Sequence, residues 1–408
     1  MILPGRRWSD LTFPLAYLGV HLAFMPVIVL LLPRRVEALA TGQAAWVLSW
    51  LLLTGAMVAG IANVLAGHLS DRWMRRHGNR RGLIALGCAA LMVSFAWLAL
   101  AGTVSALASA FVVFQLTLNL AFAPLGALLS DHVPDTDKGR VAGLLNAALP
   151  LSSGGVVLLA WLYPQDSAAA FFVNALMVAG CTAPLLIKWD FEQGAAPAHT
   201  LGGHAATRTA GVGRDFSLAW LARFLIQLGA AFVIGFLFLV LSERIQAEPA
   251  WAAGRSASET IALLSLPAAV VAIGGSVGAG RLSDRTRLRR VPMALAAAVA
   301  SLGIAILGSA AEWLLFLVGY ILFQAGLAAF LAIDSALVAQ LVGGGRHRGS
   351  LLGIMNLANT LPAVLAPAIA IASLDLTQHQ DLLELLLRTG SVAAASAAAA
   401  VLFIKQVR

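Results

Sequence analysis

Two charged residues lie inside apolar stretches of the chain, and a charge in such a stretch is a candidate for a functional role. Asp334 is part of Leu331-Ala-Ile-Asp334-Ser-Ala-Leu, and Arg223 is part of Trp220-Leu-Ala-Arg223-Phe-Leu-Ile-Gln227. A charge in such a stretch is costly unless it is paired, neutralised or facing water. Asp334 is therefore a candidate for binding a proton or anchoring a substrate, or else it belongs to a structural ion pair or helix-end contact. Arg223 is its candidate partner, or else its side chain reaches out to the membrane interface.

Uncharged polar residues in other apolar runs are candidates for lining a cavity. His21 follows Tyr17 by about one helical turn, and Asn119 follows Gln115 by the same interval, so each pair would share a helix face. The alternative for His21 is a hydrogen bond that only supports the structure, and Gln115 and Asn119 could instead join helices. Three further amides are substrate-binding candidates: Gln227, Asn356 and Asn359.

The composition of the whole chain is that of an integral membrane protein. Of its 408 residues, 60% are hydrophobic and 11% are charged, and its mean hydropathy is +0.86. A soluble domain carries about 25% charged residues. Runs of roughly 20 apolar residues match the ~30 Å hydrocarbon core of a bilayer, because a helix rises 1.5 Å per residue.

Twelve membrane-spanning helices are predicted, since lipid-facing backbone must satisfy its own hydrogen bonds and the runs are too long for barrel strands. The predicted spans are 11–32, 45–66, 83–101, 104–130, 141–162 and 169–187 in the N-terminal half, then 216–242, 258–279, 292–310, 313–341, 350–373 and 384–404 in the C-terminal half. The first run is interpreted as a retained span, since no cleavage site follows Leu32. The predicted domains are a six-helix bundle over 1–188, a flexible linker over 189–215 and a second six-helix bundle over 216–408.

A repeated motif supports the division into two halves. Its first copy lies between the second and third runs, in a predicted basic loop, and contains Gly67, Asp71, Arg72, Arg75 and Arg76. The order Gly-x-Leu-Ser-Asp-Arg returns 213 positions later between the eighth and ninth runs, at Gly280, Asp284 and Arg285. Repeats at a fixed spacing indicate duplication. Both halves are predicted to start on the same side of the membrane, so the bundles should be pseudo-symmetric about an axis along the membrane normal.

Positive charge is concentrated in the connections on one side of the predicted spans. The formal net charge is +8, and 21 of the 27 Lys and Arg residues lie in the termini and connections of one side, against 5 on the other. Cytoplasmic connections carry such an excess, which predicts that both termini and the linker are cytoplasmic. Because membrane topology accounts for the net charge, nucleic acid is not an expected partner.

These features together resemble the major facilitator superfamily. The resemblance rests on the twelve runs, the long central polar connection and the Gly-x-x-x-Asp-Arg motif after the second run, which recurs after the eighth. It implies a secondary transporter that alternates access by rocking its halves around a midplane site. It also implies that the two copies of the motif clasp the halves together on the cytoplasmic side. The alternative is that the arginines only set topology. In the second copy Arg287 and Leu288 replace the usual Gly and first Arg, which implies a weaker clasp.

Nothing in the sequence indicates an enzyme. It contains no Gly-x-Ser-x-Gly, no Walker loop and no His or Cys cluster suited to a metal, and its two cysteines, Cys88 and Cys181, lie in apolar runs. We therefore expect no cofactor, no metal and no ATP, and a proton gradient as the driving force.

The favoured function is proton-coupled symport of a small polar organic solute, similar to a sugar or glycoside. The Gly-Pro-x-x-Gly-Gly motif of the family's exporters is incomplete at Leu149-Pro150-Leu-Ser-Ser-Gly154-Gly155. The stretches around Asp334 and Asn356 resemble bacterial members related to sugar and glycoside symporters. The alternatives are a proton-antiport exporter of drugs or metabolites and, from another class, a non-transporting membrane sensor. We expect a monomer in the inner (plasma) membrane whose partners are the lipid bilayer and a small-molecule substrate.

Overall fold

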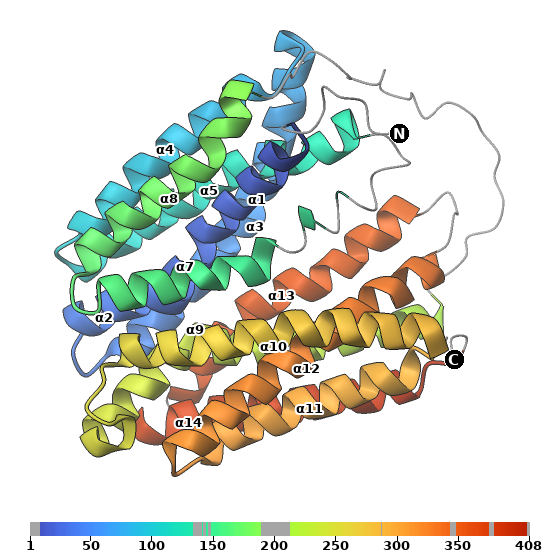
Figure 1. Cartoon of the computed structure of the whole chain (residues 1–408). Coiled ribbons are helices and arrows are strands. Elements are labelled where there is room, and N and C mark those ends of the chain that lie inside the picture. Colours follow the sequence, from blue (N-terminus) through green and yellow to red (C-terminus); the bar gives the residue numbers. More distant parts are fainter. Residues whose placement is uncertain are drawn as a thin grey trace. The chain divides into compact units, whose positions relative to one another are not determined.

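The fold is all-helical throughout the residues that the computed structural model describes, which are 9–133, 141, 144–145, 148–188, 213–286, 288–342, 348–374 and 379–405 (Figure 1). Eleven helices in this part of the chain are long and apolar enough to cross a membrane, and Leu151–Leu162 is a shorter apolar helix. The predicted all-α fold with twelve apolar helices is confirmed. The fifth predicted span, 141–162, is only partly described before Ala148.

The helices of the N-terminal half agree with the predicted spans to within a few residues at most ends. They are α1 Ser9–Pro26, η1 Val27–Leu31, α2 Leu32–Leu39, α3 Ala44–His77, α4 Arg81–Leu100, α5 Val104–His132, α7 Ala148–Leu162 and α8 Ser167–Lys188. The first span is thus built from three consecutive segments. Its middle segment, η1, is a π-helical turn that is buried along its whole length and directly follows Pro26, which lacks a backbone donor.

The C-terminal half contains the remaining long helices and one short 3-10 turn. They are α9 Arg214–Ala247, η2 Pro249–Ala252, α10 Ala257–Thr286, α11 Arg290–Ser309, α12 Trp313–Val342, α13 Arg348–Leu374 and α14 His379–Leu402. The start of α10 is fixed by a capping box. Glu259 Oε2 accepts a hydrogen bond from Ser256 N at 2.8 Å, and Ser256 Oγ accepts one from Glu259 N at 3.3 Å.

Contacts between Cα atoms divide the chain into two compact units. The first unit comprises Met1–Thr41 and Thr54–Thr207, and the second comprises Gly42–Leu53 and Arg208–Arg408. The first turns of α3 therefore group with the second unit. The predicted linker, 189–215, lies outside the described residues up to position 212.

In the first unit α4 packs against α5, and α8 packs against α1 and α4, as Figure 1 shows. Gly87 permits the close approach of α4 and α5, because a Cβ atom at this position would lie 2.7 Å from the backbone N of Ala121. In the second unit α12 packs against α10 and α11, and α14 packs against α9 and α11. A Cβ atom at Gly326 would lie 2.4 Å from Ala300 N, so α11 and α12 also meet at their backbones.

Other glycines in the apolar runs make no such close approach within their unit. A Cβ atom at Gly60, Gly274 or Gly278 would meet no atom of its own unit within 4 Å.

The repeated motif is helical, and its prediction as a loop was wrong. Residues 67–77 form the last turns of α3, and residues 280–286 form the last turns of α10. The apolar run ends near residue 66, but the helix continues because arginine and leucine are good helix formers in water. Gly78 ends α3 in the usual way, with φ +73° and its N–H bonded to the carbonyl oxygen of Met74 at 2.9 Å.

A second internal spacing relates the two halves. Helices α4 and α11 each contain 20 residues, and both ends of α11 lie 209 positions after those of α4. Each helix follows an arginine, Arg80 or Arg289, and precedes an alanine, Ala101 or Ala310. The motif copies are 213 positions apart, whereas the helices that follow them are 209 apart. The stretch from the motif to the next helix is therefore four residues shorter in the C-terminal half.

Candidate functional site

Arg223 on α9 and Asp334 on α12 form an ion pair in the second unit. Arg223 Nε donates to Asp334 Oδ2 at 2.5 Å, and a terminal guanidinium nitrogen contacts the same oxygen. Asp334 is fully buried, and the Arg223 side chain is 13% exposed. The other carboxylate oxygen, Oδ1, has no hydrogen-bond partner among the described residues. The structure therefore pairs two charges that lie 111 positions apart in the sequence.

The face of α9 that carries Arg223 also contacts α13. One turn before Arg223, the indole Nε1 of Trp220 donates to the carbonyl oxygen of Ile354 at 2.8 Å. One turn after it, Gln227 Nε2 donates to Asn359 Oδ1 at 3.3 Å. Arg223 is thus flanked by two α9–α13 hydrogen bonds while its own side chain turns to α12.

The three predicted amides form one chain of weak hydrogen bonds. Asn359 accepts from Gln227, and its Nδ2 is 3.4 Å from Asn356 Oδ1. Asn356 and Asn359 are exposed, and Gln227 is half-buried. Gln227 lies on α9 one turn after Arg223, and the two asparagines lie on α13. All three amides can exchange their hydrogen bonds with a solute.

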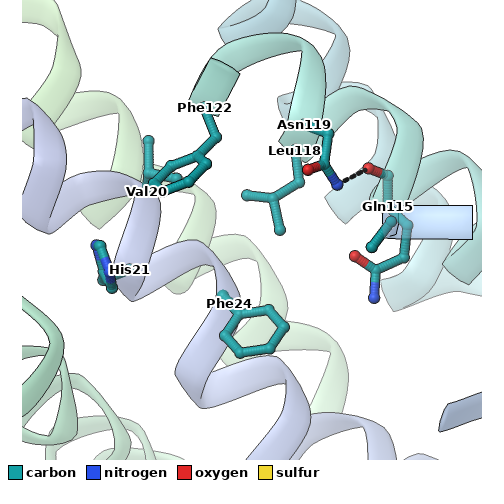
Figure 2. A pocket seen from close by; sticks show the side chains of 8 residues that line it. Val20, His21, Phe24, Gln115, Leu118, Asn119 and Phe122 are labelled. Atoms are coloured by element: carbon teal, nitrogen blue, oxygen red, sulfur yellow. Dashed lines mark hydrogen bonds between the residues drawn. The ribbon is translucent and has the colours of Figure 1, made fainter. Parts of the chain in front are cut away.

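The first unit contains a cavity of about 200 Å³ between α1, α3 and α5 (Figure 2). Eight residues line it: Val20, His21, Phe24, Ala59, Gln115, Leu118, Asn119 and Phe122. The structure thus brings three predicted candidates, from two helices, to one cavity. Tyr17 is not among the lining residues. Its ring packs on Phe122 with centroids 5.4 Å apart, and its carbonyl oxygen is 2.9 Å from His21 Nδ1.

Gln115 and Asn119 are both buried, and their amides differ in how they are bonded. Asn119 Nδ2 donates to the carbonyl oxygen of Gln115 at 2.8 Å (Figure 2). Asn119 Oδ1 accepts from Asn63 Nδ2 at 3.1 Å. Gln115 Oε1 is buried without a partner in the described part of the chain. Asn63, on α3, is a residue that the sequence reasoning missed.

The first copy of the motif is organised around Arg80, which the sequence reasoning also did not select. Arg80 is 6% exposed. It donates to Asp71 Oδ1 at 3.0 Å and to Asp131 Oδ2 at 2.7 Å, and it contacts Ser70 Oγ. This cluster joins the end of α3 to the end of α5 within the first unit. Asp71 therefore accepts from the guanidinium of an arginine in its own unit.

The remaining residues of the first copy lie at the surface. Arg72, Arg75 and Arg76 are exposed. A Cβ atom at Gly67 would meet no atom of its unit within 4 Å. The clasp that the resemblance implies for these residues stays a prediction.

The second copy is built differently. Ser283, which corresponds to Ser70, is buried and donates to the carbonyl oxygen of Leu288 at 2.9 Å. Arg285 is exposed, and Gly280 faces open space within its unit. The side chain of Asp284 lies outside what the structure describes. Within the described residues the structure gives no group of three or more His, Cys, Asp or Glu that could hold a metal ion.

A family model described as Major Facilitator Superfamily matches residues 15–367 of this chain. Two solved structures of a bacterial homologue of the human lysosomal transporter Spinster, both inward-facing, align with 99% of this chain and 95% of theirs. The occupied form gives a TM-score of 0.66 at 16% sequence identity, and the unoccupied form gives 0.63 at 15%. These identities show a shared fold alone. No curated protein sequence matches this one.

The chain belongs to the major facilitator superfamily. It is a multi-pass membrane protein of a transporter family, as the Gly-x-x-x-Asp-Arg motif and the twelve apolar runs predicted.

Proposed function

We propose that this protein is a secondary active transporter that couples protons to the movement of a small polar organic solute, most simply in symport. The observation that carries the proposal is the Arg223–Asp334 pair, in which a carboxylate with no exposed surface holds a single guanidinium. A buried carboxylate is stabilised by a cation or by a proton. Proton coupling requires a carboxylate that can exchange its cation, here Arg223, for a proton.

The position of Arg223 connects this exchange to helix movement. Arg223 holds α12 through Asp334, while Trp220 and Gln227 hold α13 from the same face of α9. Protonation of Asp334 would free Arg223 from α12 and leave the contacts to α13 in place. A change of a few kcal/mol is enough to shift a two-state equilibrium between conformations.

The cavity of the first unit supports a small organic solute as cargo. Its volume of about 200 Å³ is small for a ligand site. It combines apolar side chains, such as Phe24 and Phe122, with the polar groups of His21 and Gln115. Ligand sites commonly have this composition, in which apolar walls bind and a few polar groups orient the ligand. A sugar or glycoside, with hydroxyl groups and apolar ring faces, fits such walls.

The excess of Lys and Arg on one side supports cytoplasmic termini and an inner-membrane location. The incomplete Gly-Pro-x-x-Gly-Gly stretch supports uptake over export. Its Leu149–Gly155 residues belong to α7.

The test is solute-induced proton movement in liposomes that contain the purified protein and an internal pH-sensitive dye. A sugar, a phenyl glycoside, an organic acid and a cationic drug are each added outside. Symport predicts that the transported solute acidifies the interior. Alkalinisation would instead identify proton antiport, and counterflow of a solute without any pH change would contradict proton coupling. Binding without counterflow would identify a sensor.

A further inference from the structure

We propose that the cavity of the first unit recognises its solute through hydrogen-bond acceptors, and so selects a neutral solute that brings hydroxyl donors and an apolar face. This inference rests on the proposed transport function and names its substrate class. Two atoms carry the recognition, Oε1 of Gln115 and Nε2 of His21. Both residues line the cavity.

Gln115 supplies the first acceptor. Its side chain is 3% exposed, and Oε1 has no hydrogen-bond partner in the part of the chain that the structure describes. Figure 2 shows Gln115, Leu118 and Phe24 around the same space. A buried acceptor left unbonded costs free energy, which a donor on an incoming solute would recover.

His21 supplies the second acceptor because of its tautomer. Its Nδ1 lies 2.9 Å from the carbonyl oxygen of Tyr17. A carbonyl oxygen only accepts hydrogen bonds, so this contact places the proton of the neutral imidazole on Nδ1. The other ring nitrogen, Nε2, is then an acceptor. The ring is held in place by Phe122, whose centroid is 5.9 Å away in an edge-to-face arrangement.

Asn119 has a different role from the one its position suggests. Both ends of its amide bond to the protein, to the Gln115 carbonyl and to Asn63. Asn63 and Asn119 are therefore positioning residues that tie α3 to α5 beside Gln115. Among the acceptors of these residues and His21, Gln115 Oε1 and His21 Nε2 then remain for a solute.

The walls of the cavity argue for a neutral solute. None of its eight described lining residues is a lysine, arginine, aspartate or glutamate, so none of these eight carries a fixed charge that would balance a carboxylate or an ammonium group. Phe24, Phe122, Val20 and Leu118 offer apolar surface. A glycoside carries its hydroxyl donors and its apolar aglycone on one small molecule.

The experiment measures equilibrium binding to the full chain in lipid nanodiscs, with no proton gradient, by calorimetry. The probes are phenyl β-D-glucoside, its tetra-O-methyl derivative, phenyl β-D-glucuronide and 2-phenylethylamine. The methylated probe keeps the acceptors and the ring but has no donor. We expect the glucoside to bind about tenfold more tightly than the methylated probe, since a lost hydrogen bond commonly costs that much. The glucuronide and the amine should bind no more tightly than the methylated probe.

Two variants assign the selectivity to the named atoms. In Gln115→Met and in His21→Phe, the ratio of dissociation constants for the methylated and unmethylated probes should fall towards one. The matched control is Gln324→Met, because Gln324 lies 209 positions after Gln115 and donates to Tyr320 Oη in the second unit. Its ratio should equal that of the wild type. If one of the two site variants does not fold, the other carries the same comparison.

Four results would each overturn the proposal. They are a wild-type ratio near one, a wild-type ratio retained in both variants, tighter binding of the amine or glucuronide than of the methylated probe, and no binding of the glucoside. Because no gradient is present, failure of proton coupling leaves this binding result intact. Conversely, a solute that drives proton movement without this selectivity would contradict only the recognition proposed for Gln115 and His21.

Discussion

Arg35 and Arg244 lie 209 positions apart and make the same contact in the two units. Arg35 donates to the carbonyl oxygen of Ala101, with Nη2 at 2.7 Å, and Arg244 donates to that of Ala310. These alanines directly follow α4 and α11 and are themselves 209 positions apart. The unbonded carbonyls at the end of a helix attract a cation. The duplication therefore extends to a helix-capping contact that the sequence motifs did not indicate.

Arg244→Ala should destabilise the protein more than Arg35→Ala. Arg244 also donates to the carbonyls of Leu307 and Gly308 and lies 5.2 Å from the Phe316 ring centroid. We expect the free energy of unfolding to fall by about 3 kcal/mol for Arg244→Ala and by about 2 kcal/mol for Arg35→Ala. Denaturation of the purified protein in detergent measures both.

The control for these two variants is Arg388→Ala. Arg388 is 69% exposed and pairs with Glu384 one turn before it. Its loss should cost less than about 0.5 kcal/mol. A cost equal to that of Arg244→Ala would show that the capping contacts add nothing.

Arg80→Met should be more disruptive than Arg76→Met, although both residues belong to the basic segment 72–81, which runs from the last turns of α3 to the start of α4. Arg80 is buried and bonds to Asp71 and Asp131, whereas Arg76 is exposed. Removing Arg80 takes a shared cation from Asp71, whose side chain is 61% exposed, and from Asp131, whose side chain is 21% exposed, at a cost of about 2 kcal/mol. Arg76→Met should stay within about 0.5 kcal/mol of the wild type. Thermal denaturation of both variants checks the order, and the opposite order would show that Arg80 does not hold this cluster.

Two glycines should respond to alanine with opposite signs. In Gly326→Ala the new methyl group would collide with the backbone of Ala300, and overpacking costs about 1–3 kcal/mol. In Gly274→Ala the methyl group meets no atom of its unit, and better helix propensity should add up to about 1 kcal/mol. Midpoints of thermal unfolding compare the two. Equal midpoints would contradict the close backbone approach of α11 and α12.

The effects of substituting Arg223 and Asp334 on the free energy of unfolding should depend on each other. Arg223→Met leaves a buried carboxylate without its cation and should cost about 3–5 kcal/mol. The double variant Arg223→Met with Asp334→Leu removes both charges and should recover most of that loss. Unfolding free energies of the wild type, the single variants and the double variant form the required cycle. Additive costs would show that the two side chains do not interact.

The sequence was sufficient for the helices and insufficient for the contacts of their side chains. Apolar runs predict membrane helices because bilayer thickness sets their length. The same rule predicted that α3 ends near residue 66, because the hydropathy falls towards the arginines at 72–76. The helix in fact continues to His77. The sequence placed Arg223 and Asp334 at a similar depth in the membrane. It did not show that their side chains face each other, because tertiary packing decides which faces of α9 and α12 meet.

Arg80 and Asn63 were missed for two different reasons. The resemblance drew attention to Arg75 and Arg76, while Arg80 follows the motif and becomes buried only because the chain turns at Gly78. The 209-residue spacing between Arg80 and Arg289, at the starts of α4 and α11, was an available signal. For Asn63 the sequence offers no comparable signal, because a single asparagine in an apolar run does not reveal a partner such as Asn119.

Accumulation of phenyl β-D-glucoside in liposomes under an imposed pH gradient tests the central claim most directly. The wild type and Glu384→Gln, an exposed carboxylate control, should accumulate the solute when the outside is acidic. Asp334→Asn cannot exchange a proton, so it should lose accumulation and still exchange internal for external solute at equal pH. Accumulation by Asp334→Asn at the wild-type level would contradict the assignment of proton coupling to Asp334.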